Sequence, residues 1–341
     1  MNSAQFRNKI SMRMNKKCWS LVAAFCFLFL ESICQTSTLP VATDDSSSIY
    51  LADPTIFHHQ KNYYLYGTVG GNARNGFLVY VSKDLKNWKL SDKNNGYALK
   101  NGDAFGTTGF WAPQVFYDNH KFYMAYVANE NIAIAESDSP LGPFTQTKKE
   151  SLTAPVKQID PFVFIDDDGK KYLYHVRLTN GNRIFVAQLE DDFSAIKPGT
   201  LQECIAATER WENTAHASWP VAEGPTVLKH KGLYYLVYTA NDFRNPDYAV
   251  GYAISSSPAG PWTKYAGNPI LNKEMVGVNG TGHGDFFKKG RGLFYVFHTH
   301  NSNTKVGPRR TALAKAQFVK NNKREMDNLV IDKKSFYFLK K

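Results

Sequence analysis

The stretch WPVAEGPTVLKHKGLYYLVYTAND, residues 219–242, contains the pattern that decides the fold. Its Gly224-Pro225 pair favours a turn that leads directly into a strand at 226–229. A polar turn at 230–232 then precedes a second strand at 233–239, which is rich in Tyr, Leu and Val. The pattern therefore predicts a strand pair with the carboxylic acid Glu223 at its entrance.

The same phrase occurs five times along the chain. The copies are ADPTIFHHQKNYYLYGT from Ala52, WAPQVFYDNHKFYMAYVA from Trp111, IDPFVFIDDDGKKYLYHV from Ile159, EGPTVLKHKGLYYLVYTA from Glu223 and GHGDFFKKGRGLFYVFHTH from Gly282. Aligning them places five residues at equivalent positions, 48 to 64 residues apart: Asp53, Ala112, Asp160, Gly224 and His283. Repeats of this length are typical of propeller blades. The sequence thus predicts an all-β, five-bladed β-propeller with four-stranded blades, whose ring must close because each blade buries its apolar faces only against its neighbours.

The N-terminus is typical of an export signal. Five basic residues precede an apolar run at 19–30 that is too short for a stable membrane span. Cleavage after Ser32-Ile33-Cys34 is one alternative, and lipidation of Cys34 is the other. We predict a signal peptide at 1–34, a flexible Ser/Thr/Asp-rich lead-in at 35–48 and one five-bladed propeller domain at 49–341, exported to the periplasm or to the cell surface and medium.

Composition narrows the class of protein further. Three of the four cysteines lie in the predicted leader, so Cys204 has no partner for an internal disulfide and stability must come from packing between blades. The formal net charge of +11 is scattered, with no basic helix and no nucleic-acid-binding module. We expect a monomer that binds no nucleic acid.

Two connections and the tail have expected places in this ring. The polar connections at 90–109 and 197–218 are the longest, and we expect them to line the rim of a pocket. The charged tail after Phe318 ends in SFYFL from Ser335. It is expected to complete the sheet of the last blade or to lie across it.

Three of the five equivalent strand entrances carry an acid: Asp53, Asp160 and, one residue earlier, Glu223. The innermost strands of a propeller line its channel, so these side chains should converge at one mouth of the ring. Acids placed together desolvate and repel one another, which raises at least one pKa. Glycoside hydrolysis needs such a set, because one carboxylic acid must be protonated while a second carboxylate is ionised.

Simpler explanations exist for single acids in this chain. One Asp-Pro at a strand start can be only a turn and cap, but three acids at equivalent blade positions favour a site. The run Asp166-Asp167-Asp168-Gly169 imitates part of a calcium loop, yet it lacks the later Glu and links two strands. A surface hairpin turn is the better interpretation of that run.

The motifs ADPTI at Asp53, IDPFVF at Asp160 and AEGPT at Glu223 resemble glycoside hydrolase family 43 over residues 49–318. The resemblance implies a five-bladed propeller that hydrolyses glycosidic bonds with inversion and needs no cofactor. It also implies Asp53 as the general base that activates water and Glu223 as the general acid. Asp160 would keep the pKa of Glu223 high and orient it.

The resemblance extends to residues outside the three acids. Trp111 matches a tryptophan that stacks on the sugar, although packing within a blade is its alternative role. Arg309 in PRRTAL matches an arginine that hydrogen-bonds the sugar, and strand alternation should turn Arg310 the other way. His283 in GTGHGDFF matches a histidine of the channel that contacts a calcium ion through water in some members. A structural calcium in the channel is therefore one prediction, although calcium prefers oxygen ligands.

The resemblance and the residues together predict an exo-acting α-L-arabinofuranosidase that releases L-arabinofuranose from a plant polysaccharide or oligosaccharide. A β-xylosidase or endo-arabinanase of the same family is the neighbouring alternative, and the lack of a recognisable β-sandwich module after Phe318 favours the arabinofuranosidase. The five-bladed fructan and sucrose hydrolases, which retain configuration, carry Arg before the second Asp-Pro and Glu-Cys at the acid. Here Ile159 and Gly224 stand at those positions. A non-catalytic sugar-binding propeller is the remaining alternative, and it predicts a missing carboxylate.

Overall fold

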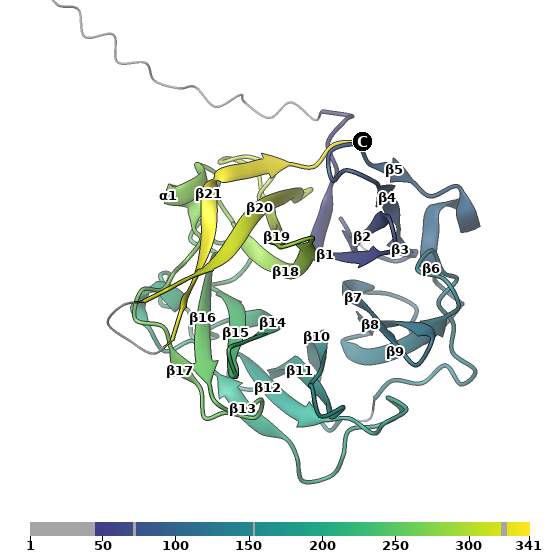
Figure 1. Cartoon of the computed structure of the whole chain (residues 1–341), viewed down its shortest axis with the longest axis horizontal. Helices are drawn as coiled ribbons and strands as arrows, with labels where there is room; N and C mark the ends of the chain where they lie inside the picture. Colours follow the sequence, from purple (N-terminus) through teal and green to yellow (C-terminus); the bar gives the residue numbers. More distant parts are fainter. Residues whose placement is uncertain (1–44, 71–72, 153, 322–325) are drawn as a thin grey trace, which may run out of the picture. The chain divides into compact units, whose positions relative to one another are not determined.

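Five β-sheets stand side by side around a central axis in the computed structural model, as the predicted five-bladed propeller requires (Figure 1). The structure describes residues 45–70, 73–152, 154–321 and 326–341. The predicted signal peptide at 1–34, including Cys34, and lead-in residues 35–44 lie outside the described residues. In each blade the first strand is nearest the axis and later strands lie progressively outward.

The elements follow one another blade by blade. Blade one contains β1 (Leu51–His59), β2 (Asn62–Val69), β4 (Tyr80–Ser82) and β5 (Lys89–Leu90), with a small accessory sheet of β3 (Gly76–Leu78) and β6 (Tyr97–Lys100). Blade two contains β7 (Trp111–Asp118), β8 (Lys121–Ala128) and β9 (Asn131–Ser137), and blade three contains β10 (Gln158–Ile165), β11 (Lys171–Leu178), β12 (Asn182–Gln188) and β13 (Gln202–Ile205). Blade four contains β14 (Ala222–His230), β15 (Leu233–Ala240), β16 (Ala249–Ser255) and β17 (Thr263–Lys264), and blade five contains β18 (Gly282–Lys289), β19 (Gly292–Thr299), β20 (Arg310–Val319) and β21 (Asn328–Phe338).

Helical structure is confined to short turns between strands. These are the 3-10 turns η1 (Lys93–Gly96) and η2 (Arg210–Glu212) and the helix α1 (Lys273–Val276). Within the described ranges, none of them has the length and apolar character needed to cross a bilayer.

Blade two departs from the four strands predicted for every blade. In the part of the chain that the structure describes, its sheet has three strands, and the expected fourth strand is reduced to a single bridge between Glu136 and Thr145. Two residues before Glu136 in β9, the carbonyl of Ile134 accepts a hydrogen bond from the side-chain amide of Gln146 at 3.0 Å. A side chain therefore takes the place of the ladder hydrogen bond that would have extended the strand.

The apolar runs of the middle strands face two blades at once. In β15, Tyr234, Leu236 and Tyr238 pack toward blade three, whereas Tyr235 and Val237 pack toward blade five. Side chains alternate across a strand, so a continuous apolar run is what a strand buried on both faces requires. In the described residues one apolar cluster fills each of the five interfaces between neighbouring blades.

The two ends of the described chain close the ring between blades one and five. The Ile49 amide donates to the Leu339 carbonyl at 3.1 Å, and the Leu51 amide donates to the Thr311 hydroxyl at 3.0 Å. Strand β21 pairs with β20 along its length, which confirms that the tail completes the last sheet. Ser48, placed in the flexible lead-in by sequence, is buried and bridges Lys340.

Each innermost strand contains the same backbone irregularity at the same position. The pairing register shifts in β1, β7, β10, β14 and β18, next to a residue with positive φ. Those residues and their φ angles are Asp53 (48°), Ala112 (45°), Asp160 (55°), Gly224 (59°) and His283 (41°). They are the five positions aligned from sequence, so the repeat alignment is confirmed at the level of single residues. A β-bulge of this kind changes the direction in which a side chain points.

Gly224 tests how tightly these bulges are packed. A Cβ atom added there would lie 2.8 Å from the His283 ring, whereas at Gly232, with φ of 78° in the same blade, it would meet nothing within 4 Å. Both glycines have positive φ, so replacement by alanine should cost about 1 kcal/mol at each from backbone strain. In addition to this strain, Gly224→Ala should lower the free energy of unfolding by on the order of 1 kcal/mol or more, because His283 must move. Denaturant unfolding of both variants measures the difference, and equal losses would contradict contact between these bulges.

Candidate active site

All six residues singled out from sequence line one pocket of about 550 Å³. They are Asp53, Trp111, Asp160, Glu223, His283 and Arg309. Because the bulges stand at the heads of the innermost strands, residues from five separate blades converge there, as predicted. Apolar pockets of this size with a few convergent polar groups are typical of small-molecule sites.

Asp53 is held in its ionised form. Its Oδ1 accepts a hydrogen bond from Arg309 Nη1 at 3.0 Å, and its Oδ2 accepts one from the Thr68 hydroxyl at 2.6 Å. Burial acts to raise the pKa of Asp53, but the positive charge of Arg309 and the nearby imidazoles of His283 and His298 outweigh it and hold the pKa below its ordinary value. Burial lowers the pKa of both histidines, so near neutral pH the cation facing Asp53 is Arg309.

Glu223 is held in the opposite state. Its Oε1 accepts from the Tyr248 hydroxyl at 2.8 Å, and its Oε2 accepts from Asn182 Nδ2 at 2.9 Å. Burial, reinforced by the negative charge of Asp53, raises the pKa of Glu223 to about 7, and the two hydrogen bonds oppose that rise without cancelling it. Near neutral pH Glu223 therefore carries a proton for a large fraction of the time.

Asp160 completes the set of acids. It is buried, and its Oδ2 accepts a hydrogen bond from the backbone N–H of Gly224 at 3.1 Å. Burial, followed by the charges of Glu223 and Asp53, raises the pKa of Asp160 well above its ordinary value. Asp160 and Glu223 are close enough to titrate as a coupled pair. Asp160 also anchors the residue that follows Glu223, so it fixes the backbone from which Glu223 extends.

The two consecutive arginines face opposite ways, as strand alternation predicts. Arg309 lines the pocket with its guanidinium 4.5 Å from the centre of the Phe243 ring. Arg310 points away and lies 3.4 Å from the centre of the Phe338 ring. Arg309 Nη1 also lies 3.2 Å from Nε2 of the fully buried His298, whose Nδ1 accepts from the Asp53 backbone N–H at 3.1 Å.

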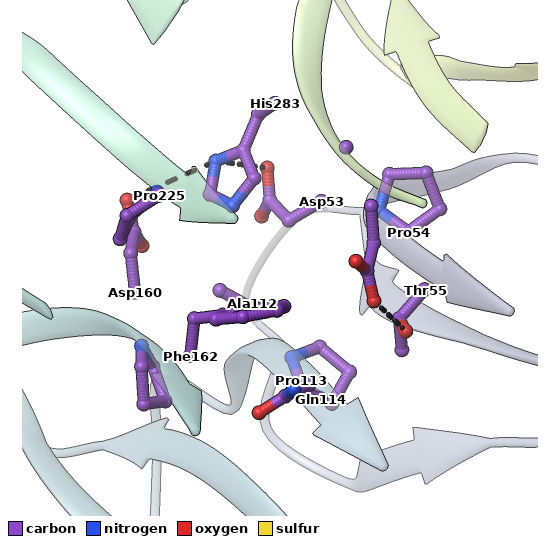
Figure 2. A pocket seen from close by; sticks show the side chains of 13 residues that line it. Asp53, Pro54, Thr55, Ala112, Pro113, Gln114, Asp160, Phe162, Pro225 and His283 are labelled. Atoms are coloured by element: carbon purple, nitrogen blue, oxygen red, sulfur yellow. Dashed lines mark hydrogen bonds and ion pairs between the residues drawn. The ribbon is translucent and has the colours of Figure 1, made fainter. Parts of the chain in front are cut away.

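His283 lies between two of the acids. Figure 2 shows its ring between Asp53 and Asp160, with its Nδ1 3.4 Å from Asp53 Oδ1 and 3.8 Å from Asp160 Oδ2. In the described residues no group of three or more His, Cys, Asp or Glu side chains is arranged to hold a metal ion. Nearby in the channel, both Asp285 oxygens already accept hydrogen bonds from threonine hydroxyls. These residues do not form the oxygen-rich cage that calcium prefers, and calcium bound near His283 through water stays a prediction.

The two other sequence-based assignments have simple structural counterparts. Trp111 is half-buried, lines the pocket and also packs against the apolar cluster between blades one and two. The run at 166–169 forms the turn between β10 and β11, in which the Gly169 amide donates to the Asp166 carbonyl. The hairpin interpretation of that run is confirmed.

Several residues of the site were not found from sequence. The connections at 90–109 and 197–218 do not line the pocket, contrary to expectation, and its wall is formed instead by Trp219 and by residues 242–244 and 306–309. Asn182, Tyr248 and His298 contact the acids directly. Of these three, only His298 could have been suspected from sequence, because it lies in a recognisable strand that ends near the aligned bulges. Asn182 and Tyr248 lie at strand starts that have no motif of their own.

A carboxylate of lowered pKa and a carboxylic acid of raised pKa in one pocket are the pair that glycoside hydrolysis requires. The chain belongs to the glycosyl hydrolases family 43, whose family model matches residues 47–323.

Solved structures with related sequences share the whole fold. A structure described as an endo-1,4-beta-xylanase from Bacteroides thetaiotaomicron is 43% identical with a TM-score of 0.76, and the match covers 84% of this chain and 95% of that one. A thermostable family-43 glycoside hydrolase is 36% identical with a TM-score of 0.75, covering 86% and 96% of the two chains.

Curated relatives are more distant. The arabinoxylan arabinofuranohydrolase of Bacillus subtilis is 28% identical, and the match covers 76% of this chain but 59% of that protein. The beta-D-galactofuranosidase xynD of Aspergillus niger is 23% identical, with 74% and 75% covered. The chain spans about half the length of some of these relatives, such as 46% of the arabinoxylan arabinofuranohydrolase of Paenibacillus polymyxa.

The raised pKa of Glu223 should appear in the pH dependence of stability. A carboxyl whose pKa rises from 4.5 when unfolded to about 7 when folded stabilises the protein at low pH, and that contribution is lost as the pH rises through this window. The difference in free energy of unfolding between Glu223→Gln and the wild type should therefore shift in favour of the variant between pH 4 and pH 8. The expected shift is on the order of 1–3 kcal/mol.

The measurement is chemical unfolding of both proteins at pH 4 and pH 8. Glu203→Gln is the matched control, because it removes an exposed carboxylate of the same length that lies outside the pocket. The same pH dependence in Glu223→Gln and wild type would show that Glu223 titrates normally.

Proposed function

We propose that this protein is an exo-acting, inverting α-L-arabinofuranosidase. The observation that carries the proposal is the opposite protonation of two acids in one pocket: Asp53 ionised beside Arg309, and Glu223 protonated. An inverting glycosidase needs this pair, one group to accept a proton from water and the other to give a proton to the leaving oxygen.

The residues supply both halves of the displacement. Asp53 takes a proton from a water molecule while the oxygen of that water forms a bond to the anomeric carbon of the sugar. Glu223 delivers its proton to the glycosidic oxygen as the bond between that oxygen and the anomeric carbon breaks. The products are a free sugar of inverted configuration and the remaining alcohol, and proton exchange with solvent restores Asp53 to the carboxylate and Glu223 to the acid.

Other groups keep the pair in these states. Arg309 uses one N–H on Asp53, and its remaining donors suit adjacent hydroxyls of the bound sugar. The raised pKa of Asp160 keeps a second proton beside Glu223, and Asp160 Oδ2 accepts the hydrogen bond from the Gly224 amide. Trp111 stacks against the sugar from the side of blade two. We assign no step of the reaction to a metal.

The choice of an arabinofuranoside draws support from the relatives. Four of those named here have furanosidase names, and three of them are the two arabinoxylan arabinofuranohydrolases and the galactofuranosidase. An extracellular exo-alpha-(1->5)-L-arabinofuranosidase of Streptomyces avermitilis is also similar, at 24% identity over 73% of this chain. The second candidate is a β-xylosidase, favoured by the similarity to a xylan 1,3-beta-xylosidase of a Vibrio species at 26% identity.

Export is part of the proposal. The basic residues followed by an apolar run at 19–30 support a cleaved leader, and a polysaccharide substrate is met outside the cytoplasm.

The proposal is tested by assaying the purified protein in parallel on aryl α-L-arabinofuranoside, aryl β-D-xylopyranoside and linear arabinan. The arabinofuranoside should give the highest kcat/KM, and proton NMR of the first product should show inverted configuration. Asp53→Ala should reduce turnover by about a thousandfold or more while sugar binding is retained, because the variant lacks the base. A retained anomer, or unchanged turnover in Asp53→Ala, would remove this mechanism, and faster cleavage of the xyloside would favour the second candidate.

The coupling of Asp160 to Glu223 should appear in the pH–rate profile. The upper limb of kcat/KM reports loss of the Glu223 proton and should lie near pH 7, the value to which its pKa is raised. In Asp160→Asn, Glu223 titrates without a neighbouring acid, so we expect the limb to move to lower pH. A limb that stays in place in this variant would show that Asp160 acts only on the backbone of Gly224.

A further inference from the structure

Trp219 is an exposed aromatic side chain on the pocket wall. Trp219 is 48% exposed, which is more than any other large apolar residue at the surface of the described ranges. Among those exposed residues, Trp219 alone lines the pocket. Burying an indole is favourable in water, so an indole kept open at the edge of a binding pocket indicates a surface meant for a partner. The flat apolar face of a sugar ring is such a partner.

The indole is nevertheless held in place. Its Nε1 donates to Oδ1 of Asn182 at 2.9 Å, and the Asn182 backbone amide donates to the Pro220 carbonyl at 2.9 Å. Val221 forms a bridge with Asn182 as well. The segment that contains Trp219 is thus tied to the start of β12, and Trp219 lines the pocket with the N–H of its indole already hydrogen-bonded.

The same asparagine contacts the acid. Indole can only donate, so Oδ1 of Asn182 must face Trp219, and the amide nitrogen must then face Glu223. That nitrogen donates to Glu223 Oε2 at 2.9 Å. A continuous chain of two hydrogen bonds therefore leads from the exposed ring of Trp219 through Asn182 to Glu223. Because the donated hydrogen bond stabilises the ionised carboxylate, Asn182 lowers the pKa of Glu223 against the effect of burial.

The position of the leaving group follows from the two acids. Resting on the function proposed above, the sugar to be released lies toward Asp53 and Arg309, and the alcohol that Glu223 protonates must leave on the Glu223 side. Trp219 is on that side, two hydrogen bonds from Glu223, whereas Thr68 and His298 surround Asp53.

We propose that Trp219 is the stacking platform for the leaving-group sugar and that Asn182 is a positioning residue that orients Glu223 from this platform. The ligand class is an oligosaccharide or polysaccharide whose sugar next to the cleaved bond presents an apolar ring face. A substrate with a small aliphatic leaving group gains nothing from this surface. The pair Trp219 and Asn182 therefore sets the preference for natural glycosides over artificial ones.

Three variants separate stacking from hydrogen bonding. Trp219→Ala removes both, and we expect KM for an arabinosylated xylo-oligosaccharide to rise about tenfold or more, a loss of roughly 1.4 kcal/mol in binding. Trp219→Phe keeps an aromatic face but lacks the N–H, so it should restore most of the KM. Asn182→Ala should leave KM close to that of the wild type and move the upper limb of the pH–rate profile to higher pH, because Glu223 loses a donor. Asn182→Ala should impair cleavage of a dinitrophenyl glycoside less than cleavage of the oligosaccharide, since the dinitrophenolate leaving group needs no proton.

The control is Tyr117→Ala, which removes a similarly exposed aromatic side chain, 43% exposed, that lies outside the pocket. It should leave all parameters unchanged. An unchanged KM in Trp219→Ala would overturn the platform, and an unmoved pH limb in Asn182→Ala would overturn the positioning role.

Binding without turnover separates this inference from the proposed function. Calorimetric titration of the same oligosaccharide into Asp53→Ala, with and without Trp219→Ala, measures the platform directly. If the wild type hydrolyses no arabinofuranoside or xyloside, the proposed function fails, yet weaker binding after Trp219→Ala still supports the platform. Equal binding by the two proteins, or no binding by either, overturns it.

Discussion

The left-handed residue inside each innermost strand is the constraint on which the pocket depends. Four of these five residues are not glycine, and a non-glycine residue in this region costs on the order of 1 kcal/mol or more. The surrounding sheet must supply that energy, and it does so through strands buried on both faces. The bulges keep the same place in every blade, so the side chains next to them are brought to one mouth of the ring. Where the residue is Asp, as at Asp53 and Asp160, that geometry presents an acid.

Burial acts in one direction on all three acids, and their partners decide the outcome. Asp53 faces the guanidinium of Arg309 and stays ionised, whereas Glu223 faces neutral donors and the charge of Asp53 and keeps its proton. Arg309 comes from the segment just before β20, far from Asp53 in the chain, and reaches it only because the ring closes between blades five and one. Closure of the fold and ionisation of the base are therefore linked: opening the contact between Ile49 and Leu339 would also loosen Arg309.

The pocket has an inner part built from regular strands and a wall built from irregular connections. The inner part is built from strand heads in register. The acid oxygens there accept hydrogen bonds from Thr68, Asn182, Gly224 and Tyr248. The wall consists of connections such as 242–244 and 306–308, where the chain is not part of a β-ladder. Chemistry thus depends on the repeated part of the fold, and the choice of substrate depends on the irregular part. This division is consistent with family relatives that carry several different substrate names on one fold.

The sequence by itself determined the five repeats, the all-β ring, the equivalence of Asp53, Asp160 and the neighbour of Glu223, and the opposite orientations of Arg309 and Arg310. These features are local or periodic: strand alternation, Gly-Pro turns and repeated spacing are written in consecutive residues. Only the tertiary structure showed which contacts keep Asp53 ionised and raise the pKa of Glu223, that Asn182 and Tyr248 hydrogen-bond Glu223, that Trp219 lines the pocket wall, and that blade two lacks a full fourth strand. Those properties depend on contacts between blades distant in the chain, and pKa values depend on the burial and charge that such contacts create, which no local pattern of residues records.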